Sequence, residues 1–223
     1  MPLRILKFFA KAVIWWLVIT VSMVLLLRFV PVTYTATMLM DERSVTRDWE
    51  QLSSIDRNMV SAVIAAEDSK FCTHNGFDVE AIEEALQERL AGERERGAST
   101  ISQQTAKNVF LWQGGGWFRK GLEAYFTFLI ENLWGKRRIM EVYLNVAETG
   151  LGTYGVESGA QRYFGHSAAR LSADEASRIA AVLPSPKTRE AVNPGGFTRR
   201  YGNTIEARIG VVRRDGLDAC VYE

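Results

Sequence analysis

The most prominent feature of the hydrophobic pattern is a long apolar stretch near the N-terminus. Residues from about Phe8 to Val30 are mostly apolar, and the segment Ala12–Leu27 contains no charged residue. A helix that crosses a bilayer needs roughly 20 consecutive, mostly apolar residues. Three cations precede the stretch, namely Arg4, Lys7 and Lys11. By the positive-inside tendency, they place the N-terminus in the cytoplasm. We predict a single transmembrane anchor within residues 1–30, with the rest of the chain outside the cytoplasmic membrane.

Two other structures produce an apolar N-terminal stretch. A cleaved signal peptide usually has an apolar core of about 7–15 residues and ends in a small-x-small site. Thr35-Ala36-Thr37 is a weak match to that site, and it comes late. A helix buried in a soluble core is disfavoured, because apolar residues occupy every face of the predicted helix. We therefore favour an uncleaved anchor, followed by a connector at residues 31–46 and one domain at residues 47–223.

Beyond residue 47 the apolar positions recur with the spacing of amphipathic helices. One stripe runs from Met59 to Ile64 and ends at Glu67. Helix starts are marked by capping boxes, in which Thr or Ser is followed three residues later by Gln or Glu; they are Thr100 with Gln103 and Ser172 with Glu175. The predicted helices cover 78–91, begin at about 101, follow the glycines at 114–116, cover 137–147, begin after 172 and include 205–212, with a charged loop at 92–96. We find no convincing strand pattern and expect a mainly α fold.

The overall composition narrows the classes of function. A formal net charge of +1 gives no reason to expect a nucleic-acid partner. The chain contains two cysteines and two histidines, so a structural zinc site is poorly supported. Cys72 and Cys220 are able to pair in an oxidising compartment, but their spacing alone does not establish a disulfide.

A pair of adjacent carboxylates, Glu67 and Asp68, follows the first apolar stripe. A carboxylate at an apolar boundary with a like charge beside it holds its proton more tightly than usual. Such a group suits a general base, which works best when its pKa lies near the working pH. The alternative is a solvent-exposed acidic pair that ends a helix, and composition alone favours that alternative.

The segment 99–108 carries polar side chains on one helix face. Four of them share the face by their i, i+3, i+4 and i+7 spacing: Thr100, Gln103, Gln104 and Lys107. Donors that converge in this way are able to hold phosphate oxygens, and a lysine ammonium stabilises a diphosphate leaving group. The alternative is an ordinary solvated face.

A third polar cluster begins the long helix after the glycines and consists of Arg119, Lys120 and Glu123. Arg119 and Glu123 are spaced i,i+4, so the simple interpretation is a surface ion pair worth at most about 0.5 kcal/mol. The chain nevertheless offers two separate carboxylates, Glu67 and Glu123, with cations between them. Glycosyl transfer from a phosphate-bearing donor needs such a set.

These clusters belong to five ordered motifs, by which the chain resembles the peptidoglycan glycosyltransferases, a family of lysozyme-like enzymes. The first motif is Glu-Asp-x-x-Phe-x-x-His-x-Gly at 67–76, the second is the segment 99–108, and the third is Arg-Lys-x-x-Glu at 119–123. The fourth runs from Lys136 to Gly165 and the fifth from Glu175 to Pro186. The resemblance covers roughly residues 47–190 and implies a two-lobed, lysozyme-like helical fold.

The resemblance implies a role for each polar residue. Glu67 corresponds to the catalytic base. Glu123 corresponds to a second essential carboxylate, which positions a divalent ion, Mg²⁺ or Mn²⁺, or assists the leaving diphosphate. The residues expected to contact substrate are Asp68, Ser99, Thr100, Gln103, Gln104, Lys107, Arg119, Lys120 and Asn145. Within this set Asn145, like Glu141, is expected to organise the cleft rather than to take part in the chemistry.

The same resemblance implies the reaction, which is polymerisation of lipid II into β-1,4-linked glycan strands, with inversion and release of undecaprenyl diphosphate. The expected partners are lipid II, the growing glycan chain, the bilayer and cell-division or elongation proteins. The enzyme is expected in the bacterial inner membrane, with its catalytic domain in the periplasm. No Ser-x-x-Lys, Ser-x-Asn or Lys-Thr-Gly set occurs, so we expect a monofunctional enzyme without a transpeptidase domain.

Two positions depart from the family pattern, because the glycines at 114–116 and Glu84 stand where basic residues are common. Both changes remove positive charge that helps to hold a diphosphate. Two other functions compete with polymerisation. A lysozyme-like hydrolase also uses two carboxylates across a cleft, although it needs neither phosphate-binding cations nor an anchor. A non-catalytic membrane scaffold would explain the missing cations but not the intact Glu67 and Glu123.

Overall fold

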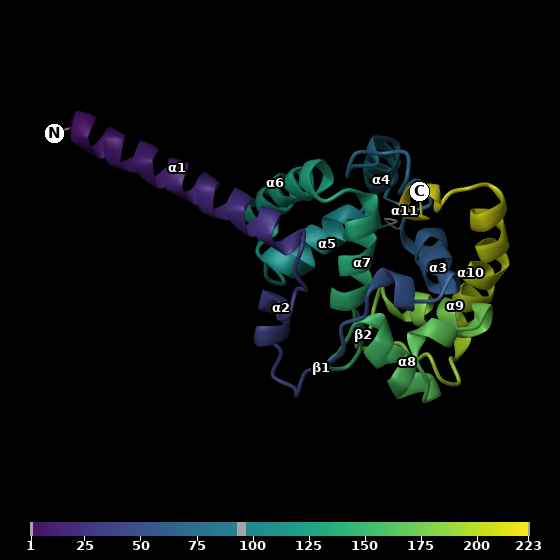
Figure 1. The fold of residues 1–223 in the computed structure, drawn as a ribbon. Coiled ribbons are helices and arrows are strands. Elements are labelled where there is room, and N and C mark those ends of the chain that lie inside the picture. Colours follow the sequence, from purple (N-terminus) through teal and green to yellow (C-terminus); the bar gives the residue numbers. More distant parts are fainter. Residues whose placement is uncertain (1, 93–96, 223) are drawn as a thin grey trace.

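The structure is a computed structural model that describes residues 2–92 and 97–222. The charged loop expected at 92–96 lies outside these residues, except for Gly92. The described chain is mainly helical, and one long helix projects from the body of the protein (Figure 1). This arrangement confirms the predicted mainly α fold behind a single apolar helix.

The projecting helix is α1, Pro2–Leu27. Its segment Arg4–Leu27 has a mean hydropathy of 2.2 and is long and apolar enough to cross a membrane. Large apolar side chains are exposed along it, whereas a core helix of a soluble domain buries such side chains. The helix therefore fits a single-pass membrane anchor, as the sequence predicts.

The C-terminal half of α1 contacts the body at defined points. The hydroxyl groups of Thr20 and Tyr125 are 2.8 Å apart. The indole N–H of Trp134 donates at 2.7 Å to the carbonyl of Val24, which also accepts the backbone amide of Arg28. Polar contacts thus attach the anchor to α6 (Gly116–Leu133) and to the residue that follows it.

A small sheet joins the connector to the domain. The connector contains the short helix α2 (Ala36–Leu39) and ends in β1 (Thr46–Arg47). β1 pairs in parallel with β3 (Thr153–Tyr154), and β3 pairs antiparallel with β2 (Glu148–Gly150), in the order β1-β3-β2. The sheet differs from the expectation of no strands, because strands of two or three residues are too short for an alternating pattern to show.

The helices of the body form two groups, which correspond to the two predicted lobes. The first group contains α3 (Arg57–Glu67), α8 (Val156–Phe164), α9 (Ala173–Val182) and α10 (Gly196–Arg214), with α3, α9 and α10 packed against one another. The second contains α4 (Val79–Leu90), α5 (Ile101–Phe110), α6 and α7 (Lys136–Val146), with α5 packed against α6 and α7. Figure 1 shows α3, α9 and α10 on one side of the body and α5 and α6 on the other.

Side-chain caps explain where several helices begin. Asp56 caps α3, and Thr100 with Gln103 forms the predicted capping box of α5. Ser172 and Glu175 form the predicted capping box of α9. Each cap satisfies backbone N–H groups that have no partner within the helix.

The core of the body is centred on α7. Ile139, Met140, Tyr143 and Leu144 of this helix are at most 1% exposed. Full burial of a large apolar side chain contributes roughly 1.5–3 kcal/mol. α7 is therefore a rigid support for the turn that follows it, from which β2 begins.

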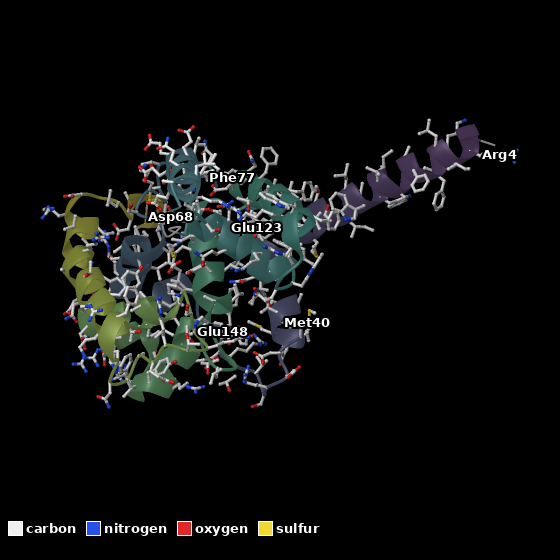
Figure 2. The ribbon with its side chains drawn as sticks, turned by 180° about the vertical axis from the view of Figure 1, so that it is seen from behind. Arg4, Met40, Asp68, Phe77, Glu123 and Glu148 are labelled. Carbon is white, nitrogen blue, oxygen red and sulfur yellow. A yellow bond between two sulfur atoms is a disulfide. The ribbon has the colours of Figure 1, made fainter. Side chains whose placement is uncertain are left out.

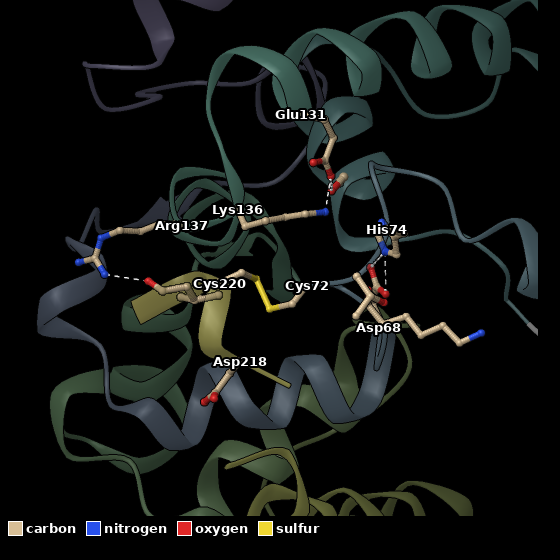
Figure 3. The surroundings of a disulfide bond; sticks show 12 residues. Asp68, Cys72, His74, Glu131, Lys136, Arg137, Asp218 and Cys220 are labelled. Atoms are coloured by element: carbon tan, nitrogen blue, oxygen red, sulfur yellow. Dashed lines mark hydrogen bonds and ion pairs between the residues drawn. A yellow bond between two sulfur atoms is a disulfide. The ribbon is translucent and has the colours of Figure 1, made fainter. Parts of the chain in front are cut away.

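A disulfide joins Cys72 to Cys220 across a sequence separation of 148, so the pair that spacing alone left open is formed. Cys72 lies in the turn after α3, and Cys220 lies in the short helix α11 (Ala219–Tyr222) (Figure 3). Nearby, the carboxylate of Asp218 accepts two hydrogen bonds from Arg57, at 2.8 and 2.9 Å. The C-terminal segment is therefore bound both to the start of α3 and to the turn at its end.

Candidate active site

Glu67 is the last residue of α3 and has one carboxylate oxygen without a partner. Its Oε2 accepts a hydrogen bond from Nε2 of Gln104 at 2.8 Å. Its Oε1 is buried and has no hydrogen-bond partner among the described residues. Burial raises the pKa of Glu67, the bond from Gln104 offsets part of this rise, and the neighbouring Asp68 adds a smaller increase. Glu67 thus has the two properties of a general base, a raised pKa and an oxygen able to accept a proton.

Asp68 is buried and engaged by the protein itself. Nε2 of His74 lies 3.0 Å from both of its carboxylate oxygens, and the backbone amide of Ile101 donates to Oδ2 at 3.0 Å. The amide of Gly76 donates to Nδ1 of His74, so Nε2 carries the ring proton and donates to Asp68. Figure 3 shows the imidazole directed at the carboxylate. Asp68 therefore fixes the turn after α3 to the start of α5.

The polar face of α5 divides into two parts. Thr100 and Gln103 are buried and form the cap: Thr100 accepts a hydrogen bond from the amide of Gln103 and donates to the carbonyl of Gly76 at 2.7 Å. Gln104 and Lys107 instead line a cavity of about 460 Å³. The structure therefore differs from the expectation that all four donors share one substrate-facing surface, because the capping box occupies the first two.

Glu123 belongs to a buried cluster of ion pairs rather than to a surface pair. Its side chain is 3% exposed, Nη1 of Arg119 lies 2.6 Å from Oε2, and Nζ of Lys120 contacts Oε1. Lys120 also lies 3.4 Å from the hydroxyl of Ser99, at the start of the second motif. Because two cations share one carboxylate, the cluster has an excess of positive charge.

Lys107 adds a third cation to this part of the cleft. It is half-buried, and within residues 2–92 and 97–222 its side chain makes no hydrogen bond or ion pair. Burial lowers the pKa of Lys107, Glu123 opposes this effect, and Arg119 and Lys120 add to it. A partly desolvated amine without a protein partner is suited to bind an anion that a ligand supplies.

Asn145 is buried in α7 and bonded to backbone groups. Its Nδ2 donates to the carbonyls of Glu50 and Glu141 at 2.8 Å, and its Oδ1 accepts from the amide of Glu50 at 2.8 Å. The carboxylate of Glu141 accepts from the amide of Leu52 at 3.1 Å. Both side chains hold the segment before α3 against α7.

The conformation of the loop explains why glycine occupies it at residues 114–116. Gly115 has a φ of +89°, and a Cβ at this position would lie 2.9 Å from Cβ of Arg119. Nε of Arg119 donates to the carbonyl of Gly114. The loop that lacks the basic residue common in the family thus holds Arg119 in place. Glu84, the second departure, is exposed on α4.

Several cleft residues were not predicted. Arg189 acts electrostatically on Glu67 and opposes the rise of its pKa. The hydroxyl of Tyr201 donates to the carbonyl of Ala66 at 2.8 Å, and Arg208 lines a second cavity, of about 230 Å³, together with Glu67. All three lie beyond the fifth motif, where the chain returns to α3. The periodic pattern of α10 gives no sign of which polar residue faces the cleft.

The described residues do not fit a divalent metal ion at Glu123. Both of its oxygens are paired with cations, whereas Mg²⁺ requires oxygen ligands. In the described part of the chain, no group of three or more His, Cys, Asp or Glu residues is arranged to hold a metal. Arg119 and Lys120 thus already supply positive charge at this carboxylate.

Comparison with known proteins gives consistent matches over most of the chain. The sequence model of one family, described as Transglycosylase, matches residues 34–208. A biosynthetic peptidoglycan transglycosylase of Caulobacter vibrioides is 49% identical over 201 residues, which cover 89% of this chain and 88% of that protein. A protein of the same description from Rhodospirillum centenum is 52% identical over 179 residues, covering 80% and 78%. Another, from Pseudomonas aeruginosa, is 48% identical over 210 residues, covering 89% and 90%.

Proposed function

This chain belongs to the transglycosylase family and is a peptidoglycan glycosyltransferase, and we propose that it polymerises lipid II into β-1,4-linked glycan strands. The donor is the growing glycan chain, whose reducing-end sugar is α-linked to undecaprenyl diphosphate. The acceptor is the 4-hydroxyl of the N-acetylglucosamine of lipid II. One observation carries the proposal: Glu67 has a buried oxygen without a hydrogen-bond partner among the described residues, and it lies close enough to Lys107 for that cation to act on its pKa.

Glu67 is the general base of this reaction. Its Oε1 accepts the proton of the acceptor hydroxyl, while Gln104 holds Oε2 and so orients the carboxylate. The hydroxyl oxygen then bonds to the anomeric carbon of the donor, and the bond from that carbon to the diphosphate oxygen breaks. The electron pair leaves on the diphosphate. Because attack occurs opposite the leaving group, the α-linked donor yields a β-linked product.

The departing diphosphate is stabilised by the cations around Glu123. Arg119 and Lys120 are held by this carboxylate, and Lys107 has no competing partner among the described residues. Cations that are fixed before the reaction stabilise developing negative charge without further reorganisation. Both oxygens of Glu123 are paired with these cations, so the carboxylate acts on the leaving group through Arg119 and Lys120.

The residues expected to contact substrate separate into two roles. We assign substrate contact to three residues that line cavities, Ser99, Gln104 and Lys107. We assign it also to the two cations paired with Glu123, which are Arg119 and Lys120. We assign a positioning role to those whose side chains are occupied by hydrogen bonds within the protein, namely Asp68, Thr100, Gln103 and Asn145.

The location follows from the substrate. The polyprenyl tail of lipid II stays in the bilayer, so the enzyme works at a membrane surface. We infer that α1 spans the inner membrane, with its N-terminus in the cytoplasm and the catalytic domain in the periplasm, where cell-division or elongation proteins are the expected partners. The hydrogen bond between Thr20 and Tyr125 supports a helix that remains attached. The disulfide between Cys72 and Cys220 supports an oxidising compartment.

The test is to incubate the full chain in detergent with labelled lipid II and to separate the products on a gel. We expect long strands that lysozyme degrades. Unchanged lipid II, from protein that a thermal unfolding transition shows to be folded, would contradict the proposed function. Shortening of preformed strands would instead indicate a hydrolase.

A further inference from the structure

Two carboxylate oxygens in the described chain are buried without a hydrogen-bond partner, Oε1 of Glu67 and Oε1 of Glu148. Buried polar atoms are nearly always paired, and an exception needs an explanation. For Glu67 the explanation is its proposed action as a base. The buried oxygen of Glu148 also needs an explanation, and none of the roles assigned above involves this residue.

Glu148 begins β2, directly after α7, and lines the cavity of about 460 Å³ that also contains Gln104 and Lys107. Gln104 joins this cavity to Glu67, because it donates to Oε2 of the base. Lys187, from the loop after the fifth motif, lines the same cavity. In Figure 2, the label of Glu148 lies below those of Asp68 and Glu123. Cavities of roughly 300–1,000 Å³ hold small ligands.

The carboxyl group of Glu148 has charged neighbours but no ion-pair partner among the described residues. Burial raises the pKa of this carboxyl, Lys187 offsets part of the rise, and Asp41 adds to it. Within the described residues, neither cation of the cavity forms an ion pair with Glu148. Asp41 is itself occupied by the hydroxyl of Tyr154 at 2.8 Å. The backbone of Gly152 acts as a hydrogen-bond donor to this carboxylate and lowers its pKa, but Oε1 has no donor within the described residues. A partner for Oε1 must therefore come from a ligand or from solvent.

We propose that Glu148 binds the sugar part of the glycan substrate in this cavity, accepting a hydrogen bond from an amide N–H or a hydroxyl of an N-acetylated amino sugar. A partly desolvated carboxylate forms strong hydrogen bonds with such donors. Lys187 lies at the same cavity and is a donor only, suited to the acetyl and hydroxyl oxygens. The inference rests on the proposed function, which supplies the substrate. It adds a binding residue that holds the sugar in register with Glu67.

The test compares Glu148→Ala with Glu148→Gln in steady-state polymerisation of lipid II. Glutamine keeps an oxygen that accepts a hydrogen bond, whereas alanine keeps none. We expect a KM increase of about three- to tenfold for the alanine variant, the loss of one hydrogen bond, with kcat little changed. The glutamine variant should return KM toward the wild-type value. Glu190→Ala is the matched control, because Glu190 is exposed and lies outside the residues that line the cavity.

A purely structural role has a different signature. The backbone of Gly152 also lies near the carboxylate, so Glu148 could serve only to hold the turn between β2 and β3. That role predicts a lower Tm and a lower kcat for the alanine variant, without a rise in KM, and this result would overturn the inference. Wild-type kinetics for Glu148→Ala would overturn it as well.

Failure of the proposed function is separable from failure of this inference. A folded wild-type protein that makes no polymer contradicts the proposed function alone. In that case, titration of the wild type and of Glu148→Ala with a soluble N-acetylglucosamine-containing disaccharide, followed by NMR, tests the sugar site directly. Weaker binding by the variant supports the inference, and equal or absent binding by both proteins overturns it.

Discussion

The carboxylate of Asp68 accepts a hydrogen bond from the backbone amide of Ile101, with 3.0 Å between Oδ2 and the nitrogen. A negative charge at the start of a helix is favourable, because the first N–H groups have no partner within the helix. This bond joins the residue after Glu67 to the first turn of α5, which carries Gln104. Gln104 in turn donates to Glu67. Asp68 therefore determines how the base meets the residue that orients it.

We predict that Asp68→Asn lowers both stability and kcat and leaves KM for lipid II little changed. An asparagine directs an N–H group at a donor, either His74 or Ile101, and one buried group loses its partner. Such a loss costs roughly 1–3 kcal/mol. Urea unfolding and steady-state kinetics measure the two effects. A higher KM with unchanged stability would show that Asp68 contacts substrate instead.

The raised pKa of Glu67 predicts the acid limb of the activity profile. A general base must be ionised, so kcat/KM should fall on acidification with a midpoint above 4.5, the ordinary value for glutamate. Gln104→Leu removes the hydrogen bond that opposes the rise. The acid limb of this variant should therefore lie at higher pH than that of the wild type. A midpoint at or below the ordinary value would count against Glu67 as the base.

The same pKa shift predicts how stability depends on pH. A group whose folded-state pKa is raised contributes stability below its unfolded pKa, and this contribution is lost as pH rises through the folded pKa. The contribution of Glu67 should therefore decline as pH rises above 4.5. Glu67→Gln removes this dependence, so the variant should have a higher Tm than the wild type at neutral pH. Thermal unfolding of both proteins from about pH 4 to about pH 8 makes the comparison, and a lower neutral-pH Tm for the variant contradicts it.

We predict that Glu123→Gln lowers kcat strongly and destabilises the fold by roughly 1–3 kcal/mol. The loss is smaller than for a fully buried pair, because the side chain of Lys120 is 41% exposed. Glu80→Gln is the matched control: it breaks a pair with Lys70 in which the glutamate side chain is 79% exposed, and it should change stability by at most about 0.5 kcal/mol.

Chelation of divalent ions tests the other role considered for Glu123. If the carboxylate acts only on Arg119 and Lys120, adding a chelator to the wild type should not reproduce the loss seen in Glu123→Gln. A fall of the wild-type rate to the level of the variant would place a metal ion at Glu123.

The disulfide predicts a dependence of stability on oxidation. Replacing Cys72 and Cys220 by serine should lower the free energy of unfolding by roughly 2–5 kcal/mol. Guanidinium unfolding with and without reductant measures the effect: the reduced wild type should match the double variant, and the variant should not respond to reductant. A double variant as stable as the oxidised wild type would contradict a structural role for the bond.

Much of the helical fold could be predicted, because apolar periodicity and side-chain caps are local signals. The bounds expected for α4 and α7 lie within one residue of those observed, and α5 begins where it was expected to begin. The sheet could not be predicted, because each of its strands is held by pairing with distant chain rather than by a pattern of its own. The pairing of Cys72 with Cys220 likewise depends on how α11 packs, which spacing does not reveal.

The candidate site was predicted in part, for a similar reason. Glu67 and Gln104 come together from separate motifs, as the resemblance implied. Thr100 and Gln103 carry two signals at once, because the spacing of a capping box is also the spacing of a shared helix face. Sequence alone could not decide between them, and burial decides for the cap. Arg189 reaches the cleft only through tertiary folding, so no local pattern identifies it.

The central claim is that Glu67 removes the proton of the acceptor hydroxyl, and Glu67→Gln tests it most directly. Polymerisation of labelled lipid II should be measured for this variant and for the wild type at saturating substrate. General-base catalysis contributes roughly 10²–10⁴-fold in rate, so the variant should lose at least about 10²-fold in kcat while it still binds lipid II. A variant that keeps its fold and polymerises within about tenfold of the wild-type rate would contradict the account.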